Sequence, residues 1–392
     1  MPLRYGKEFL MIPGPTNVPE EVLRAMHRPA IDIYEGPLLE TTDACLFGLK
    51  QLFRTEGKTY IYAANGHGAW DAALTNTLNR GDKILALHSG LFAAGWGEAS
   101  KLLDLNVEVL PGTWRTAVDP DQLEARLKED TGHEIKAILV VQVDTASGVW
   151  NDIQALRKAI DAAKHPALFM VDTIASLGCI PFEMDEWGID VALTGSQKGL
   201  MSPPGLSFVA AGPKADKAHE TANLRTNYFD WTFRQGPVHY QKYCGTPPEH
   251  LLFGFRKALD LVFDEGLEQV WNRHTLLADA TRAAVIQWAK GGVLEFNIED
   301  PRHRSDSVTV VRLKDTDPEP LRDFTKEVCG VTIGGTIGEL SNEGIRIAHM
   351  GHVNAVMTLG TLSAIELGLA KLDIPHEKGG VQAAIDTLAG AL

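Results

Sequence analysis

Three segments of the chain carry residue types that could do chemistry, and each follows a short apolar run. Asn65-Gly66-His67-Gly68 comes after Tyr60–Ala63, and its glycines would let backbone N–H groups approach a phosphate at the start of a helix. Asp172 ends a second apolar run, where a buried carboxylate is costly unless a cation such as a protonated pyridine nitrogen pairs with it. Lys198 follows a third run, and its amine could form a Schiff base with an aldehyde cofactor and then move a proton at Cα.

Each segment also has a plain structural interpretation. The glycines could form an ordinary turn, Asp172 could cap a helix or lie in a surface loop, and lysines are mostly solvated. The order along the chain is harder to obtain by accident: a glycine loop, then an aspartate at a strand end, then Ser-x-Lys. We therefore interpret the three segments as parts of one site, because ligands collect at the carboxyl ends of parallel strands.

Alternating strands and helices are expected to position this site. Short buried runs predict strands at Lys83–Leu87, Val107–Leu110, Ile135–Val143, Ala167–Asp172, Ile189–Ser196 and Leu206–Gly212. Between them, Asp119-Pro120 and Asp152 are typical helix starts. This alternation predicts an α/β fold with a mostly parallel central sheet and helices on both faces.

From about Phe255 the strand–helix alternation gives way to longer helical patterns. Helical spacing in Phe255–Phe263 and Leu267–Trp271, interrupted at Gly266, is followed by a long helix to about Lys290. Strands at Ser307–Leu313 and Ile345–Ala348 and a closing pair of helices follow. We predict an N-terminal arm (1–20), a large cofactor-binding domain (21–265) and a smaller C-terminal α+β domain (266–392), in close contact because no flexible linker is visible.

Composition excludes several classes of protein. The net charge of −14 argues against nucleic acid as a partner, because phosphate backbones require a basic surface. The longest apolar runs are strand-sized, so no membrane span is expected. The four cysteines form no C-x-x-C pair, which favours reduced thiols in the cytoplasm. The region around Asp144, Glu249 and His250 has no spacing that indicates a metal or hydrolase site.

A set of ordered motifs resembles the class V aminotransferases of fold type I, in particular the alanine/serine–glyoxylate aminotransferase group. The resemblance covers about residues 10–370. Its motifs are Pro13-Gly14-Pro15-Thr16-Asn17-Val18-Pro19, Gly66-His67, Val171-Asp172-Thr173-Ile174-Ala175-Ser176-Leu177-Gly178, Gly195-Ser196-Gln197-Lys198 with Pro203-Pro204-Gly205, Tyr243-x-x-Thr246 and Arg346-Ile347.

This resemblance implies pyridoxal 5'-phosphate as the cofactor and gives a role to each matching residue. Lys198 would carry the cofactor and Asp172 would pair with the pyridine nitrogen. The remaining cofactor-binding residues would be Asn65, Gly66, His67, Phe92 stacked on the ring, Thr145 at the ring hydroxyl, Thr173, Gln197, and Tyr243 with Thr246. The residues that bind substrate would be Pro15, Thr16, Tyr34 and Arg346, the last as a bidentate partner of the α-carboxylate.

The resemblance also implies a homodimer with shared active sites, since Tyr243 and Thr246 resemble residues that reach the neighbouring subunit's phosphate. A dimer of dimers is compatible with this assignment. The implied reaction moves an amino group from serine, alanine or aspartate to a 2-oxo acid, taken to be glyoxylate, with ping-pong kinetics. Each of three residues also has an ordinary structural interpretation. Phe92 could be a core residue, Tyr243 could be a packing residue, and Arg346 could form an exposed salt bridge.

Two positions depart from the family pattern. Asp32-Ile33-Tyr34-Glu35-Gly36-Pro37 replaces a His-Arg-Ser-Pro or His-Arg-Gly-Pro stretch, and Asp144 replaces a glutamate or asparagine. Both features resemble those of pyridoxamine–pyruvate aminotransferase, which uses a cofactor vitamer as its substrate. The sequence therefore does not decide which compound donates the amino group. A cysteine desulfurase, suggested by Cys329, is a further alternative, although Gln197 precedes the lysine where desulfurases tend to have histidine. The last alternative is a nucleotide-binding dehydrogenase, or a non-catalytic binding module, built on the Asn65–Gly68 turn.

Overall fold

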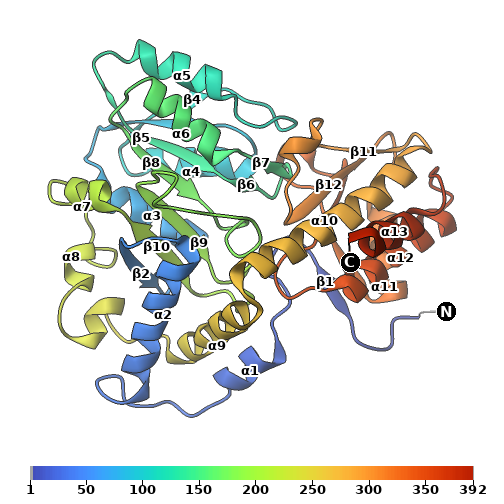
Figure 1. Ribbon diagram of the computed structural model, residues 1–392, viewed down its shortest axis with the longest axis horizontal. Coiled ribbons are helices and arrows are strands. Elements are labelled where there is room, and N and C mark those ends of the chain that lie inside the picture. Colours follow the sequence, from blue (N-terminus) through green and yellow to red (C-terminus); the bar gives the residue numbers. More distant parts are fainter. Residues whose placement is uncertain (1–2, 392) are drawn as a thin grey trace.

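The computed structural model describes residues 3–391, in which the strands form two sheets and a short hairpin (Figure 1). Met1, Pro2 and Leu392, at the ends of the predicted first and last ranges, lie outside the described residues. The larger sheet has the spatial order β2 (Lys58–Tyr62), β10 (Ser207–Ala211), β9 (Val191–Gly195), β8 (Leu168–Asp172), β5 (Ile135–Val141), β3 (Lys83–Leu87) and β4 (Asn106–Leu110). The hairpin is β6 (Val143–Asp144) with β7 (Val149–Trp150).

The helices that accompany this sheet are α1 (Glu20–Met26), α2 (Pro37–Phe53), α3 (Gly66–Thr77), α4 (Leu91–Lys101), α5 (Pro120–Glu129), α6 (Ile153–Ala162), α7 (Pro213–His219), α8 (Trp231–Arg234), η1 (His239–Tyr243) and α9 (Glu249–Glu265). The predicted starts of α5 and α6 are confirmed. Asp119 accepts a hydrogen bond from the Asp121 N–H at 2.9 Å, and Asp152 accepts one from the Ala155 N–H at 3.0 Å.

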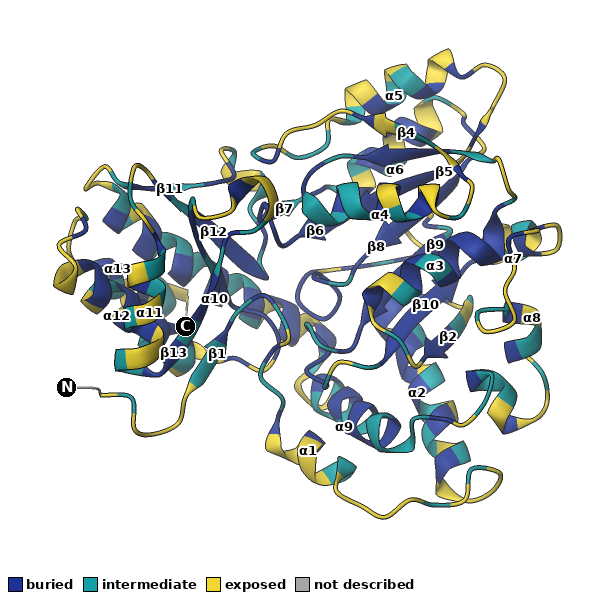
Figure 2. Cartoon of the chain, turned by 180° about the vertical axis from the view of Figure 1, so that it is seen from behind, coloured by how far each residue is buried: buried dark blue, intermediate teal, exposed yellow. Residues whose placement is uncertain are grey.

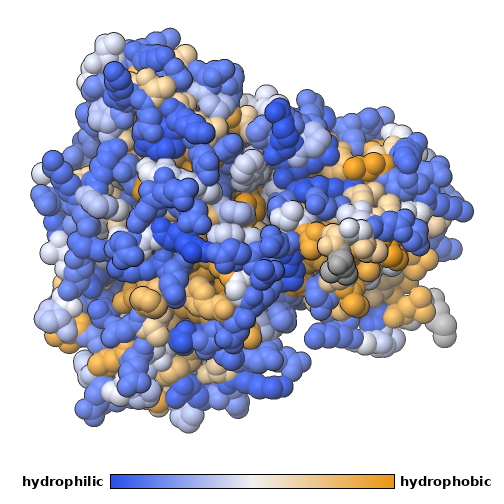
Figure 3. Space-filling view, viewed as in Figure 1, coloured by the Kyte–Doolittle hydropathy of each residue, from blue (hydrophilic) through white to orange (hydrophobic). Residues whose placement is uncertain are grey.

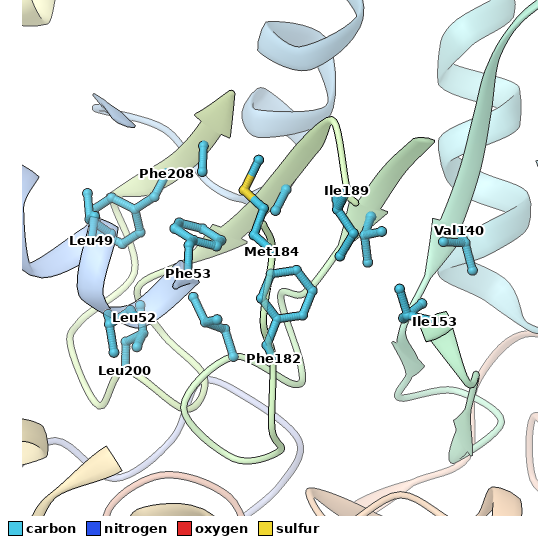
Figure 4. Packing of buried hydrophobic residues seen from close by; sticks show 14 of the residues in the cluster. Leu49, Leu52, Phe53, Val140, Ile153, Phe182, Met184, Ile189, Leu200 and Phe208 are labelled. Carbon is cyan, nitrogen blue, oxygen red and sulfur yellow. The ribbon is translucent and has the colours of Figure 1, made fainter. Parts of the chain in front are cut away.

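The central strands are buried on both faces, as Figure 2 shows from behind. Alternate residues therefore enter different cores: Phe169 and Val171 of β8 join one cluster, and Leu168 and Met170 join the other. Figure 4 shows the first cluster, in which Phe53 of α2 approaches Phe182 edge-on with ring centroids 6.3 Å apart. The helices thus cover both faces of the sheet, as the α/β pattern predicts.

Two details of this sheet differ from the predicted pattern. The strand at Val107–Leu110 was predicted to be buried, but β4 is an edge strand, and Val109 keeps 48% of its surface exposed. β10 runs antiparallel to both of its neighbours, β2 and β9, in an otherwise parallel sheet. The carboxyl ends of β5, β8 and β9 still meet at one edge, because these strands pair in parallel.

The second sheet has the order β1 (Phe9–Met11), β13 (Val331–Gly335), β14 (Gly344–Ala348), β12 (Val308–Leu313) and β11 (Leu294–Phe296). Its helices are α10 (Leu267–Ala289), η2 (Pro301–His303), α11 (Glu319–Cys329), η3 (Gly338–Leu340), α12 (Ala355–Lys371) and α13 (Gly380–Ala391). The chain changes sheets at Gly266, which separates α9 from α10 at a φ of 88°. β1 is the exception, because it comes from the predicted arm and pairs with β13.

A shared apolar cluster joins the two parts of the molecule. It combines Val143, Ala146 and Ala175 from the first part with Val308 and Val310 from the second. α10 runs across the junction between the two parts in Figure 1. None of the helices in the described part of the chain has both the length and the apolar composition of a membrane span.

Candidate active site

A cavity of about 220 Å³ opens at the carboxyl ends of β5, β8 and β9. Its walls contain eight of the residues selected from the sequence: Asn65, Gly66, His67, Phe92, Thr145, Asp172, Gln197 and Lys198. Trp70, Val141, Val143, Ile174 and Ala175 complete it. The structure therefore brings the three separate sequence segments into one pocket, which is a common geometry for small-molecule sites in α/β sheets.

Lys198 lies three residues beyond β9, and its amine donates a hydrogen bond to the carbonyl of Pro13. Gly14, at a φ of 99°, lies against this side chain so closely that a Cβ would come 2.7 Å from Lys198 Nζ. Burial is the main cause that lowers the pKa of Lys198, to about 8. An amine with a pKa of about 8 is neutral in roughly a tenth of molecules at pH 7, far more than an ordinary lysine, and the neutral amine is the nucleophilic form.

Asp172 ends β8, and its carboxylate is buried in the same cavity. One oxygen accepts a hydrogen bond from Trp70 Nε1 at 2.6 Å, and the other accepts one from the Ile174 N–H at 2.7 Å. Burial raises the pKa of Asp172 to about 7, and these donors only partly oppose it. A buried carboxylate of this kind is stabilised by a cationic partner, such as a protonated ring nitrogen.

The start of α3 forms another wall of the cavity. Asn65 Oδ1 accepts hydrogen bonds from the N–H groups of His67 at 3.1 Å and Gly68 at 3.4 Å, so these two donors are already satisfied. Gln197 Oε1 is buried without a hydrogen-bond partner in the described structure. The amide of Gln197 thus retains hydrogen-bonding capacity toward a ligand in the cavity.

Asp144, the residue that suggested a vitamer-binding enzyme, is not part of the cavity wall. Its carboxylate accepts hydrogen bonds from the N–H groups of Phe92 (2.8 Å), Ala93 (3.0 Å) and Ala146 (3.0 Å). It therefore caps the start of α4, whose own N-cap residue, Gly90, has no side chain to do so. Through these bonds Asp144 fixes Phe92 and Thr145 on the cavity wall.

Arg346 lies in β14 and points toward the cavity mouth, where it lines an adjoining cavity with Lys198, Phe92 and Thr145. Its Nε donates to the carbonyl of Gly335 at 2.6 Å and its Nη1 donates to the carbonyl of Thr145 at 3.2 Å. Burial is the main cause that lowers its pKa, to about 10. Since both bonds go to neutral carbonyls, the guanidinium charge has no carboxylate partner among the described residues.

The remaining residues selected from the sequence do not line this first cavity. Thr16 Oγ1 donates to the Lys198 carbonyl at 2.8 Å, and Thr173 Oγ1 donates to the Leu193 carbonyl at 2.9 Å, so both hold backbone in place. Pro15 is exposed, and its neighbours Pro13 and Gly14 line the mouth instead. Tyr34 and Thr246 are also exposed, whereas the Tyr243 hydroxyl is buried against Thr42 Oγ1 at 2.8 Å.

Two contacts around the cavity were missed by the sequence interpretation. The sequence places Trp70 on a helix and Pro13-Gly14 in a motif, but it does not indicate that Trp70 contacts Asp172 or that Pro13 and Gly14 contact Lys198. For Trp70 the sequence does contain a signal, because an aromatic N–H donor one helical turn after the glycine loop could be expected to face the same site. No local signal shows that Gly14 approaches Lys198, because the contact joins distant parts of the chain.

Comparisons with known proteins agree with this geometry. The family model described as aminotransferase class-V matches residues 49–345. The chain is 39% identical to the serine–glyoxylate aminotransferase of Methylorubrum extorquens, over 97% of this chain and 96% of that protein. It is 38% identical to the L-aspartate–glyoxylate aminotransferase of Paracoccus denitrificans, over 96% and 94%. The solved pyridoxamine–pyruvate aminotransferase of Mesorhizobium loti has a TM-score of 0.90 at 25% identity, covering 100% of both chains.

Proposed function

This chain belongs to the class V aminotransferases, and from that premise we propose that it moves an amino group from a small amino acid to glyoxylate with pyridoxal 5'-phosphate as cofactor. Serine, alanine and aspartate are the candidate donors. The observation that carries the proposal is that Lys198 and Asp172 share one cavity with pKa values displaced toward each other. Such pairs are typical of sites that move protons.

The residues present fit the proposed cofactor. Asp172 supplies a buried carboxylate for a ring nitrogen, and the Nε2 group of Gln197 together with the Gly66 N–H at the start of α3 supplies donors for a phosphate. Phe92 and Ile174 are apolar walls for a flat ring. When bound, pyridoxal phosphate supplies an aldehyde that condenses with amines and a ring that takes up the electrons released at the substrate Cα.

The chain's own residues perform the remaining steps. Arg346 binds the α-carboxylate of the amino acid and later that of the oxo acid, because the two occupy the same site in turn. Lys198 Nζ takes the proton from Cα in one half-reaction and returns a proton to Cα in the other. Asp172 keeps the ring nitrogen protonated. The two half-reactions give ping-pong kinetics.

We propose a homodimer in which Tyr34 and Thr246, both exposed, act at the partner's site. Tyr243 was expected to do the same, but its hydroxyl is buried against Thr42 Oγ1, so it supports the segment that carries Thr246 instead. Large apolar side chains exposed near these residues support this arrangement: Phe47 (63% exposed), Tyr228, Val238 and Tyr240. Figure 3 shows hydrophobic residues gathered over the region of α2 and α9. The four cysteines are unpaired, which supports the proposed cytoplasmic location.

Two alternatives from the sequence fit less well. Asp144 suggested a vitamer-binding enzyme, but its carboxylate is fully engaged by backbone N–H groups away from the cavity. Cys329 suggested a desulfurase, but it ends α11, lies in neither cavity wall, and has a pKa raised by burial. Family membership excludes a dehydrogenase or a binding module built on the glycine turn.

An absorption spectrum of the purified protein, with each donor added in turn, tests the proposal. We expect a band near the visible edge that at least one donor bleaches and that glyoxylate then restores. Lys198→Ala should lose this band, while Lys214→Ala, a lysine outside both cavities, should keep it. No band after reconstitution with pyridoxal phosphate would contradict the proposal.

A further inference from the structure

Trp70 is a buried tryptophan of α3 that lines the cavity proposed to hold the cofactor. Its indole Nε1 donates a hydrogen bond to Asp172 Oδ2 at 2.6 Å. Phe92 and Ile174 already supply apolar walls to this cavity, and neither has a polar side-chain atom. The N–H group of Trp70 therefore distinguishes it from a plain wall residue.

Aromatic neighbours fix the direction of this N–H group. The ring of Trp70 stacks on that of Trp96 in α4, with centroids 5.9 Å apart and an interplanar angle of 11°. The ring of His67 meets it in an edge-to-face arrangement with centroids 4.5 Å apart. Both indoles are 1% exposed. Because the ring is held between these neighbours, its N–H cannot turn away from Asp172 without breaking the stack.

The carboxylate of Asp172 has few donors. Within residues 3–391 it accepts hydrogen bonds from Trp70 Nε1 and, at 2.7 Å on its other oxygen, from the Ile174 N–H. Each carboxylate oxygen can accept a further bond, so the group can still receive a ring N–H from the cavity. With Asp172 only 2% exposed, water is largely excluded, and each of the two donors carries a large share of the stabilisation of the negative charge.

The balance at Asp172 is close to neutral pH. Burial raises its pKa to about 7, and the Ile174 and Trp70 donors oppose that effect. Of the charged groups nearby, Asp144 raises this pKa and Lys198 lowers it. His67 is the titratable group that packs on Trp70 from the cavity side. One donor more or less can therefore decide where a proton between this carboxyl group and a bound base lies.

We propose that Trp70 is a positioning residue whose hydrogen bond to Asp172 keeps the proton shared by that carboxyl group and the cofactor ring on the ring nitrogen. This inference rests on the proposed function. The indole N–H stabilises the carboxylate more than the carboxylic acid, so it draws the shared proton toward the nitrogen. The proton moves along one hydrogen bond, from the Asp172 oxygen to the nitrogen, and no other bond forms or breaks. A protonated ring takes up the electrons from the substrate Cα better than a neutral ring.

The first test follows the ring nitrogen directly, by NMR of the holoenzyme reconstituted with nitrogen-15-labelled pyridoxal phosphate. The wild-type resonance should lie in the range of a protonated pyridine. Trp70→Phe keeps an aromatic ring and removes the N–H, so it should move the resonance toward the neutral range. Trp96→Phe is the matched control, because it removes an indole of the same stack whose Nε1 has no hydrogen-bond partner in the described structure. An unchanged resonance in Trp70→Phe, or an equal change in Trp96→Phe, would overturn the role of Trp70.

Binding and kinetics separate this role from simple packing. Trp70→Phe should lower kcat about tenfold with every donor and change KM less than about threefold, because the donors bind at Arg346. It should raise the dissociation constant of pyridoxal phosphate about tenfold, but not that of an analogue with C–H in place of the ring nitrogen, which shares no proton with Asp172. An equal loss of affinity for both compounds would assign Trp70 to packing alone and overturn the proposal.

A measurement on the cofactor-free protein separates this inference from the proposed function. The carboxyl carbon of Asp172, followed by carbon-13 NMR, should titrate near pH 7, and Trp70→Phe should raise the midpoint by about one pH unit. In the wild-type chain the indole proton of Trp70 should titrate with the same midpoint, which needs no variant. A constant indole resonance, or a midpoint that Trp70→Phe leaves unchanged, would overturn the inference. Failure of pyridoxal phosphate to bind the wild-type chain would instead overturn the proposed function, and the titration would still decide on Trp70.

Discussion

At the residue scale, the amine of Lys198 is held by a contact between distant segments. Pro13 and Gly14 follow β1, while Lys198 follows β9, and the two segments meet through the Lys198–Pro13 hydrogen bond. Gly14 permits this approach because it has no side chain and adopts a positive φ. The position of the Lys198 amine thus depends on the residue that faces it as well as on its own strand.

Gly14→Ala should disturb this arrangement. The new Cβ would lie 2.6–2.7 Å from the Lys198 side chain, at a φ of 99° that costs a non-glycine residue about 1–3 kcal/mol. We expect cofactor attachment, followed by absorption, to slow at least tenfold. Gly81 has a similar φ of 82°, but open space surrounds its Cβ position. Gly81→Ala should therefore introduce the same backbone strain without slowing cofactor attachment. Equal rates in both variants would contradict the clash.

The lowered pKa of Lys198 predicts a pH dependence. Below about pH 8 the neutral amine decreases tenfold per pH unit, so attachment of pyridoxal phosphate to cofactor-free protein should accelerate up to about pH 8 and then level off. Asp172→Asn removes a negative charge that raises the pKa of Lys198, so it should move the midpoint to lower pH. Stopped-flow absorption from pH 6.5 to 10 measures both the rise and its midpoint. A rate that still rises between pH 9 and 10 would refute the lowered pKa of Lys198.

At the element scale, α4 receives its cap from the β6–β7 hairpin and not from its own sequence. The carboxylate of Asp144 complements the positive start of α4 and closes the turn at Ala146. Burial raises the pKa of this carboxylate, and its backbone donors oppose that effect. One side chain therefore sets the relative position of a helix and a turn that both contribute to the cavity wall.

Replacing Asp144 with alanine should lower the free energy of unfolding by about 1–3 kcal/mol, because buried N–H groups lose their acceptor. It should also weaken cofactor binding, since Phe92 and Thr145 lose their anchor. Asp152→Ala removes a helix cap remote from the cavity and should lower stability without changing the cofactor dissociation constant. Denaturant titration and fluorescence titration with pyridoxal phosphate measure the two effects. Unchanged affinity in Asp144→Ala would contradict the anchoring role.

At the scale of the whole molecule, two buried histidines brace the second part of the chain near the site. His274 of α10 accepts a hydrogen bond from the Gly351 N–H at 2.9 Å, and His349 bonds to Thr309 Oγ1 at 2.9 Å. Gly351 in turn lies beside the backbone of Lys198. Burial lowers the pKa of both imidazoles to about 3, so the folded protein keeps them neutral.

This arrangement predicts sensitivity to acid. Below the unfolded pKa of about 6.5 only the unfolded state takes up these protons, so stability is lost as pH falls toward 3, by about 1.4 kcal/mol per pH unit for each histidine. Urea unfolding at pH 7, 6 and 5 measures the slope. His274→Gln should remove about half of the histidine contribution, whereas His27→Gln, at an exposed position, should not change it. Equal slopes in both variants would contradict the assignment.

The sequence alone determined the properties that depend on local pattern. Hydrophobic runs and helix caps predicted the α/β architecture, most strand positions and the change to longer helical patterns near Gly266, because secondary structure responds to periodicity and capping. The resemblance predicted the family and eight residues that the structure brings together in the walls of one cavity. The division into an arm and two domains stays a prediction, and β1 of the arm lies in the second sheet.

The tertiary structure decided what depends on contacts between distant segments. Local hydrophobicity predicts neither that β4 lies at the edge of its sheet nor that β10 runs antiparallel to β9. Which strands pair, and in which direction, depends on contacts between segments that are distant in the sequence. Likewise, no spacing in the sequence shows that Asp144 caps α4 or that Gly14 meets Lys198. These contacts exist because folding places separate backbone segments within hydrogen-bond distance, and they determine which residues face the substrate.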